Sequence, residues 1–137
     1  MEAGSDPAAT IAAFYAAYNR GDANAAAALY APDGRHVETA QGRVATGRED
    51  VASGLRHFLE SFPDAHWEPE RTIVDDDHAA VPYVLTGTLT KRLGPFEPAG
   101  QVLELRGVHL FALTGSAIQA TEDIWDSGTF ARQMRNA

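Results

Sequence analysis

The chain has 137 residues, 45% of them hydrophobic and 22% charged, which is enough for one hydrophobic core and too few for two ordinary domains. Its formal net charge of -8 and its scattered Lys and Arg residues argue against nucleic acid or an anionic membrane as a partner. The absence of cysteine excludes disulfides, thiolate nucleophiles and thiolate metal sites.

We therefore expect one domain over residues 1–137. The first nine residues have no basic segment followed by an apolar one, as a signal peptide would, and no apolar run approaches the length needed to cross a bilayer. A cytoplasmic protein with no membrane partner is the expectation.

Two helices are expected near the start of the chain. Large side chains recur with the spacing of one helical face at Ile11, Phe14, Tyr15 and Tyr18. Gly21 can end this helix. A shorter helix is expected from Asp22, carrying Leu29 and Tyr30, until Pro32 stops it. A turn then leads into a short strand around His36 and Val37.

A third helix is expected after this strand. Thr46 to Glu49 has the spacing of a capping box. The apolar face that follows consists of Val51, Leu55, Phe58, Leu59 and Phe62, and Pro63 ends the helix.

From Trp67 onward, the sequence predicts strands rich in Val, Leu, Thr and aromatic residues. The expected strands cover residues 68–74, 78–91, 101–113 and 117–125. They are separated by the hairpin turn Asp75–Asp77, by a Pro- and Gly-containing segment at 93–100 that we expect to act as a lid, and by a turn at 114–116. Helices followed by a meander of long strands predict an α+β domain.

The strand at 101–113 places a histidine in an apolar row. Its odd-numbered residues are Leu103, Leu105, Gly107, His109, Phe111 and Leu113. Because alternate side chains of a strand share a face, His109 is expected on the buried face. It is either a core histidine bonded to a hydroxyl or carbonyl group, or a functional histidine with a partner on the next strand.

The candidate partner is Asp123, whose face depends on the register of the hairpin. A two-residue turn at Gly115–Ser116 pairs Thr114 with Ala117 and sets His109 opposite Glu122. A three-residue loop or a bulge instead sets His109 on the face shared by Gln119, Thr121, Asp123 and Trp125. The sequence alone leaves both registers open.

The order of these features resembles the SnoaL-like group of the nuclear-transport-factor-2-like superfamily over nearly the whole chain. The resemblance rests on short motifs taken in order: Tyr18–Asp22, Leu29–Asp33, Gly47–Glu49, Leu85–Thr88 and Ile124–Asp126, then a tail with Phe130 and Gln133. It implies a cone-shaped fold, in which a strongly curved mixed or antiparallel sheet wraps over three N-terminal helices and leaves a deep cavity. It also implies a homodimer through the outer face of the sheet, where Val108, Leu110 and Ala112 lie.

In the polyketide cyclases of this group, an aspartate on the last strand acts as acid and base in an intramolecular aldol closure, beside a histidine on the preceding strand. Asp123 and His109 resemble that pair, and His36 resembles another pocket histidine. The chain departs from the pattern at Gly107, where those cyclases carry a Gln, and at Ser53, where they offer an Asn. Both departures remove hydrogen-bond donors, which leaves the type of reaction open.

These observations predict a cofactor-independent cyclase or isomerase of polyketide or antibiotic biosynthesis, acting on a hydrophobic, ketone-bearing small molecule. Asp123 in an apolar cavity should have a raised pKa and take and return a proton, with His109 as donor to the enolate oxygen. The mechanism needs no metal, and no histidine pair has zinc-helix spacing. The alternatives are a shape-driven pericyclase, a hydroxylase, or a non-catalytic dimeric ligand-binding domain.

Further side chains are expected to contact the substrate, because a cone fold exposes part of its aromatic core to the cavity. The predicted substrate-binding residues are His36, Tyr15, Tyr18, Phe58, Phe62, Trp67, Tyr83, Phe111, Gln119 and Trp125. Asp126 is expected to be structural and to bond the C-terminal tail.

Overall fold

The computed structural model describes residues 6–135. The helices are α1 (Pro7–Asn19), α2 (Ala23–Ala28), α3 (Arg48–Ser61) and α4 (Ser127–Arg135). The strands are β1 (Tyr30–Glu38), β2 (Arg43–Thr46), β3 (His66–Pro69), β4 (Ile73–Asp75), β5 (His78–Thr88), β6 (Val102–Thr114) and β7 (Ala117–Trp125). The predicted α+β class is confirmed. Within the described part of the chain, no helix combines the length and apolarity needed to cross a membrane.

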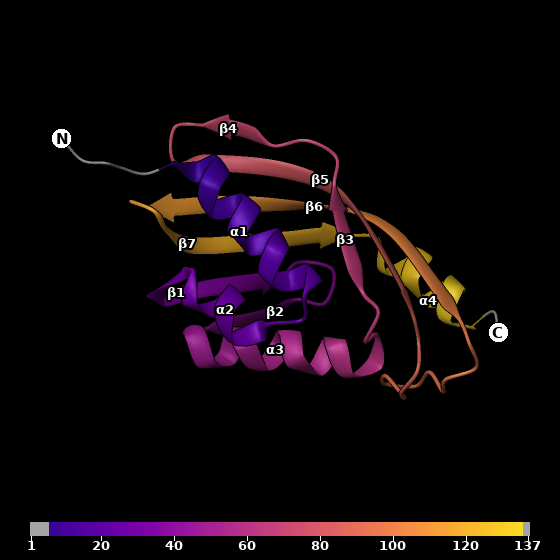
Figure 1. The fold of residues 1–137 in the computed structure, drawn as a ribbon. Helices are drawn as coiled ribbons and strands as arrows, with labels where there is room; N and C mark the ends of the chain where they lie inside the picture. Colours follow the sequence, from indigo (N-terminus) through magenta and orange to yellow (C-terminus); the bar gives the residue numbers. More distant parts are fainter. Residues whose placement is uncertain (1–5, 136–137) are drawn as a thin grey trace.

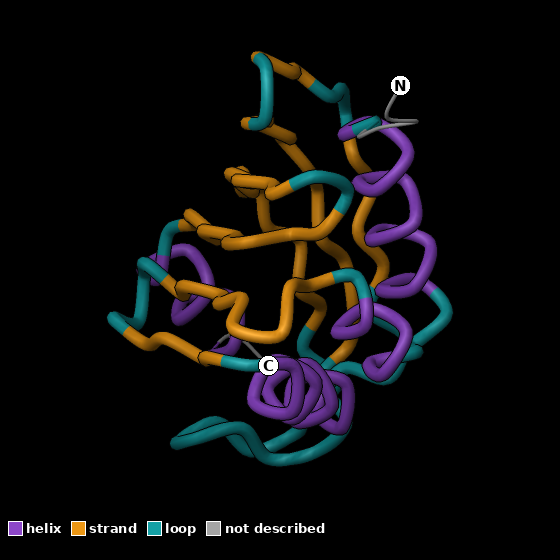
Figure 2. Tube along the Cα trace, turned by 90° about the vertical axis from the view of Figure 1, so that its left-hand side faces the viewer, coloured by secondary structure: helices purple, strands orange, loops and turns teal. Residues whose placement is uncertain are grey.

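The strands form one mixed sheet in the order β2-β1-β7-β6-β5-β3, with β4 paired to β5. β1 runs parallel to β7, and the other pairs among the described strands are antiparallel. Figure 1 shows α1 crossing in front of the sheet and α3 running below β1 and β2. Helix α4 lies on the right of the same view, beside β6. In Figure 2, turned by 90°, the strands follow a strongly curved path beside these helices. The concave face of the sheet is therefore the face that the helices cover.

Helix α1 attaches to the sheet through the apolar face predicted from its sequence. Ile11, Phe14, Tyr15 and Tyr18 are all buried. The ring of Phe14 packs edge-on against Phe111 of β6, with 5.1 Å between ring centroids. Burying aromatic side chains of this size is the main source of stability for such a contact, and it fixes α1 across the middle of the sheet.

The structure corrects several predicted boundaries. Tyr30 begins β1 instead of ending the second helix, because its side chain is fully buried and its hydroxyl bonds Thr121 on the adjacent strand. β1 therefore runs from Tyr30 to Glu38, well beyond the short strand predicted around His36. The N-cap of α3 is Gly47, without a side-chain cap, so the predicted capping box does not form. The predicted strand at 68–74 divides into β3 and β4, and β2 and α4 were not predicted.

The β6–β7 hairpin combines both registers that the sequence left open. Thr114 pairs with Ala117 and Leu113 with Ile118, as a two-residue turn requires. Further along, Ala112 pairs with Ala120, so Gln119 is the extra residue of a bulge. Because a one-residue shift exchanges the two faces of a strand, everything beyond the bulge changes face. His109 consequently lies directly opposite Asp123.

The segment at 93–100, predicted to be a lid, has internal backbone bonds and is joined to the rest of the fold at its C-terminal end. Leu93 and Phe96 exchange backbone hydrogen bonds. The side-chain nitrogen Nε2 of Gln101, a residue only 4% exposed, donates to the backbone carbonyl oxygens of Glu97 and Met134. These bonds join the segment to α4. Leu93 reaches the cavity, so the segment forms a fixed part of its rim.

The tail carries a structural aspartate, as predicted. Asp126 accepts hydrogen bonds from the backbone nitrogen and the hydroxyl of Thr129, at 3.0 and 2.7 Å, in the first turn of α4. These bonds hold the pKa of Asp126 below its usual value. The aspartate therefore stabilises the start of α4 and takes no part in the cavity.

Candidate active site

A cavity of about 380 Å³ opens between α3, the first two strands and the concave face of β5 to β7. Its apolar lining includes Val51, Leu55, Phe58, Trp67, Leu85, Leu93, Leu105, Trp125 and Phe130. Its polar lining includes Tyr18, His36, Glu38, Gln41, Arg43, Asp50, Ser53, His57, Tyr83 and Asp123. The accessible lining of the cavity is mostly apolar, as the sequence predicted, and it combines an aromatic wall with several groups that can transfer protons.

Asp123 lies on β7 at the wall of this cavity, where the bulge has turned it toward the inside. Its residue exposure is only 9%. The hydroxyl of Tyr83, on β5, donates a hydrogen bond of 2.5 Å to its Oδ1 atom. Among the described residues, the hydrogen bonds to this carboxylate engage Oδ1, so Oδ2 is available to a molecule in the cavity.

His109 lies behind Asp123 and is fully buried. Its Nδ1 atom is 2.7 Å from the hydroxyl of Tyr15, and its ring stacks on Tyr83 with 4.6 Å between centroids. Its Nε2 atom is 3.5 Å from Oδ1 of Asp123 and, within the described part of the chain, has no hydrogen-bond partner. The interaction of His109 with Asp123 is therefore electrostatic, and it comes from the side of the carboxylate away from the cavity.

The pKa of Asp123 lies below its usual value. Burial alone would raise this pKa, because it disfavours the charged form. The electrostatic interaction with His109 and the hydrogen bond from Tyr83 outweigh burial. The direction is opposite to the raised pKa expected from the sequence, so this carboxylate is ionised at neutral pH.

The surrounding tyrosines remain protonated donors. Burial, assisted by the negative charge of Asp123, raises the pKa of both Tyr15 and Tyr83 well above the usual value of a phenol. Each hydroxyl therefore keeps its proton at neutral pH and can donate it in a hydrogen bond.

A second polar group lies on β1 beside Asp123. The Nδ1 atom of His36 is 2.6 Å from the hydroxyl of Thr121, which is 2.7 Å from the hydroxyl of Tyr30. The Nε2 atom of His36 is 2.6 Å from Oε2 of Glu38. Trp125 donates to the other oxygen of Glu38, at 2.9 Å. This chain of hydrogen bonds runs from the core to the cavity surface.

One set of side chains in the site has the composition of a metal centre. His36, Glu38 and Asp123 each offer a ligand atom, and these atoms lie within 4.8 Å of one another. Imidazole and carboxylate ligands suit zinc and other divalent transition metals. These three residues could therefore act either as ligands of a metal ion or as proton-transfer groups, and metal removal distinguishes the two roles.

The structure brings most of the predicted site residues to the cavity. The lining contains Asp123, His36, Tyr18, Phe58, Trp67, Tyr83 and Trp125. It does not contain His109, Tyr15, Phe62, Phe111 or Gln119.

These five positions correct the prediction, each for a structural reason. His109 and Tyr15 bond to each other behind Asp123. Phe62 stacks on Phe58 as part of the core, and Phe111 packs against α1. Gln119 is the bulge residue and bonds to Asp33 at the surface. Strand parity placed His109 and Phe111 on the inner face correctly, but they lie in the core behind the cavity.

Sequence reasoning missed Glu38, which the structure places at the centre of the polar lining. A signal was present: Glu38 follows His36 by two positions, so any strand that contains both presents them on one face. The predicted strand ended at Val37 and therefore excluded it. Arg43 and Gln41 come from the loop and the short strand after β1, which have no periodic pattern that could have revealed them.

Replacing Tyr15 by Phe is expected to lower the free energy of unfolding by about 1–3 kcal/mol, because it leaves the buried Nδ1 of His109 without a partner. In an H109L background, the same substitution should cost little or nothing, since it then removes a hydroxyl that has itself lost its partner. Urea unfolding of the four proteins measures both effects. Equal costs in the two backgrounds would contradict the assigned bond.

Comparison with known proteins is consistent with this fold. A family model described as a SnoaL-like domain matches residues 11–120. No curated protein sequence matches the chain.

Solved structures share the architecture at low identity. A candidate polyketide cyclase from Xanthomonas campestris pv. campestris is 24% identical, with 93% of this chain and 96% of that chain covered and a TM-score of 0.86. IdmH from Streptomyces antibioticus, also named as a candidate polyketide cyclase, is 23% identical, with 96% and 99% covered and a TM-score of 0.82. A protein from Catenulispora acidiphila, described as having a ketosteroid isomerase-like fold and solved with trimethylamine, is 21% identical, with 92% of each chain covered and a TM-score of 0.82. The predicted cone fold is confirmed.

Proposed function

The chain belongs to the SnoaL-like domain family, and on this basis we propose that it is a cofactor-independent cyclase or isomerase for a polyketide-like or other ketone-bearing small molecule. The observation that best supports this proposal is the position of Asp123, a buried carboxylate at the cavity wall with one oxygen facing the interior. Such a group can take a proton from the carbon next to a substrate carbonyl. Holding the substrate against it would supply the orientation that the step needs.

The residues behind Asp123 have supporting roles in this proposal. His109 does not line the cavity, so it stabilises the ionised carboxylate instead of donating to the substrate. Tyr83 fixes the direction of the carboxylate through Oδ1. The result is a base whose free oxygen is held toward the substrate in one orientation, which is the preorganisation that efficient proton abstraction requires.

The lining of the cavity suggests the class of substrate. Phe58, Trp67 and Trp125 present aromatic surface, which suits a planar or fused-ring molecule. Arg43 adds a positive charge to the lining, which suits a substrate carrying a phenolate or carboxylate group. A ketone-bearing aromatic compound satisfies both features.

The experiment is catalysed hydrogen–deuterium exchange at the carbon next to a carbonyl. The probe is 2-tetralone, a bicyclic aromatic ketone, incubated with the protein in D₂O and followed by proton NMR. We expect the protein to accelerate loss of the α-proton signal over buffer alone. Tight binding of the probe without accelerated exchange would contradict an enzyme and favour a ligand-binding domain.

The proposal includes a homodimer formed through the outer face of β6 and β7. Leu110 and Ile124 on this face are 37% and 40% exposed, and Val108 lies between them in the register. Light scattering should give twice the chain mass of 14.7 kDa. The L110E variant should give the mass of one chain, whereas I73E, on β4 and 51% exposed, should not change it. A wild-type mass of 14.7 kDa would rule out this dimer.

A further inference from the structure

We infer that His36 and Glu38 form a second proton-transferring pair in the same cavity, which gives a proton to the substrate oxygen while Asp123 takes one from carbon. The inference rests on the proposed function, since it assigns the second half of the same reaction. Both residues line the cavity, so both can touch a bound molecule.

The pair is placed by the parallel pairing of β1 with β7. In that register, Glu38 lies beside Asp123 and His36 lies beside Thr121. Alternate residues of a strand share a face, so His36 and Glu38 point to the same side as the base. A substrate carbonyl and its neighbouring carbon are joined by one bond, and two adjacent proton-transfer groups are what such a substrate needs.

The hydrogen bonds of Glu38 hold it in one orientation. One oxygen accepts from the indole nitrogen of Trp125 at 2.9 Å, and the other accepts from Nε2–H of His36 at 2.6 Å. The side chains of His36 and Glu38 are 14% and 22% exposed, so water has limited access to them. Charged hydrogen bonds of this length in a partly dry site are strong.

The other side of His36 permits two protonation states. Its Nδ1 atom meets the hydroxyl of Thr121, which in turn meets the hydroxyl of Tyr30, and both of these residues are fully buried. A hydroxyl can donate or accept by rotating its hydrogen. When His36 is neutral, Thr121 donates to Nδ1, and when His36 is charged, it accepts from Nδ1–H. The imidazole can therefore gain or lose a proton without losing a buried hydrogen bond.

A donor separate from Asp123 is needed because the other candidates are occupied or out of reach. Asp123 is held in its ionised form, and His109 does not reach the cavity. The hydroxyl of Tyr83 is already donated to Asp123. Developing negative charge on the substrate oxygen must be neutralised for proton abstraction to be fast. Tyr18, Arg43 and His57 also line the cavity, but the His36–Glu38 pair is the one that strand pairing sets directly beside Asp123.

The step balances without any co-reactant. Oδ2 of Asp123 takes the α proton, the C–H electron pair becomes the carbon–carbon double bond of an enol, and the C=O π pair moves onto oxygen. That oxygen takes the proton that Nε2 of the charged His36 holds against Oε2 of Glu38, so this N–H bond breaks and the imidazole is left neutral. In the reverse direction, Asp123 returns a proton to carbon and the enol oxygen returns one to the pair. In D₂O the returned proton is deuterium, which is the exchange that the probe reports.

The test uses E38Q, H36Q and the double variant in the 2-tetralone exchange assay. Each single variant should lower kcat about 100-fold, the contribution typical of general acid catalysis, with little change in KM. The double variant should lose about the same amount as either single variant, because residues that act as one unit are not additive.

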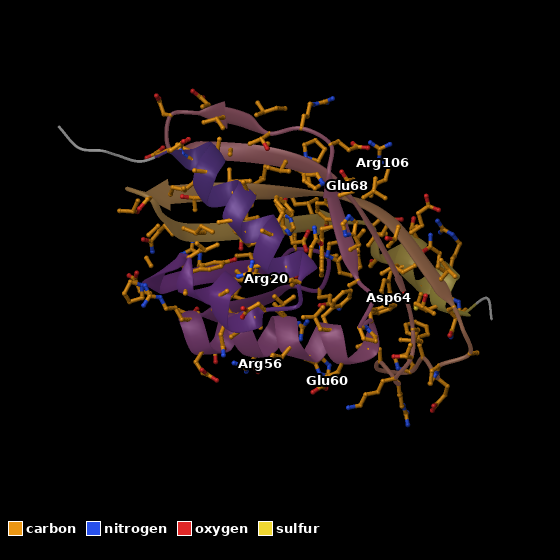
Figure 3. All side chains as sticks on the ribbon, viewed as in Figure 1. Arg20, Arg56, Glu60, Asp64, Glu68 and Arg106 are labelled. Carbon is orange, nitrogen blue, oxygen red and sulfur yellow. The ribbon has the colours of Figure 1, made fainter. Side chains whose placement is uncertain are left out.

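The matched control is a second histidine–glutamate pair with the same spacing. His66 and Glu68 on β3 lie 3.1 Å apart, with side chains 52% and 69% exposed, and neither lines the cavity. Figure 3 shows Glu68 on the outside of the molecule near Arg106. H66Q and E68Q should exchange the probe at the wild-type rate.

The outcomes separate this inference from the proposed function. If D123N loses exchange while E38Q stays within about twofold of wild type, the pair has no catalytic part and the inference is wrong. If the wild-type protein does not exchange the probe, the proposed function itself fails. If dialysis against EDTA removes activity and Zn²⁺ restores it, His36, Glu38 and Asp123 act as metal ligands, which would also overturn the inference.

Discussion

Replacing Asp123 by Asn is expected to lower catalysed exchange of 2-tetralone about 100- to 10,000-fold, the range that a positioned general base contributes. Asn has nearly the same shape and its side-chain oxygen can still accept from Tyr83, but it cannot take a proton at neutral pH. The loss should therefore appear in kcat, with the fold retained. Exchange kinetics and circular dichroism of the purified variant measure the two parts.

The control is D77N. Asp77 also lies against a histidine, with 2.8 Å to Nδ1 of His78, but this pair is at the surface, with side chains 66% and 69% exposed. The D77N variant should keep the wild-type rate. A D123N protein that is folded and as active as D77N would show that Asp123 is not the base of the exchange reaction.

The low pKa of Asp123 predicts that the exchange rate does not fall through protonation of this base when the pH is lowered moderately. Burial raises this pKa, but His109 and Tyr83 lower it further, so the carboxylate stays ionised throughout the neutral range. Lowering the pH from about 8 to about 5 should therefore not protonate the base. The same shift stabilises the fold above the usual Asp pKa, and this stability is lost as the pH falls through the lower, native value.

The fold was predictable from the sequence where the apolar residues of a helix or strand recurred with one clear spacing. The face of α1 and the buried row of β6 both appear in the structure as predicted. β2 and the extension of β1 were not predictable in this way. β2 is mostly exposed and has no alternation, and the start of β1 depends on Tyr30 packing against β7, which is distant in sequence. Long-range pairing outweighed local preference at that position.

The site was predictable only up to the register of one hairpin. The apolar row of β6 located His109, but a bulge at Gln119 decides whether Asp123 faces it, and nothing local distinguishes that bulge from a regular strand. The distance of His109 from the cavity, and the consequent low pKa of Asp123, depend on how deeply the neighbouring rings pack. Those features belong to the tertiary structure and not to any single segment.

Gly107, at the position where the resemblance described above implies a Gln, leaves the space that the phenol ring of Tyr83 occupies. A Cβ atom at this position would overlap the hydroxyl oxygen of Tyr83 and would lie 2.5 Å from the ring carbon that bears it. No side chain other than Gly leaves room for the phenol. The space of the missing side chain is thus filled by Tyr83, whose hydroxyl supplies a donor to Asp123.

Replacing Gly107 by Ala should therefore lower the free energy of unfolding by about 1–3 kcal/mol, the cost of overpacking a core. It should also reduce exchange of the probe, because the displaced Tyr83 no longer orients Asp123. G54A, in α3, is the contrasting case. A Cβ there meets nothing within 4 Å, so this substitution should raise stability by about 0.5–1 kcal/mol through helix propensity. Urea unfolding measures both changes.

A double-mutant cycle with Tyr83 identifies the cause of the cost. Y83A removes the obstructing ring, so G107A should cost less in that background by about 1 kcal/mol or more, leaving only a close approach of 3.0 Å to the carbonyl oxygen of Ile124. Y83F removes the hydroxyl but keeps the ring carbon at 2.5 Å, so it should relieve much less of the cost. Equal costs of G107A in all three backgrounds would mean that Gly107 is required by the backbone of β6. The selective relief expected in Y83A would instead show that a glycine on one strand and a tyrosine on the next together orient the base.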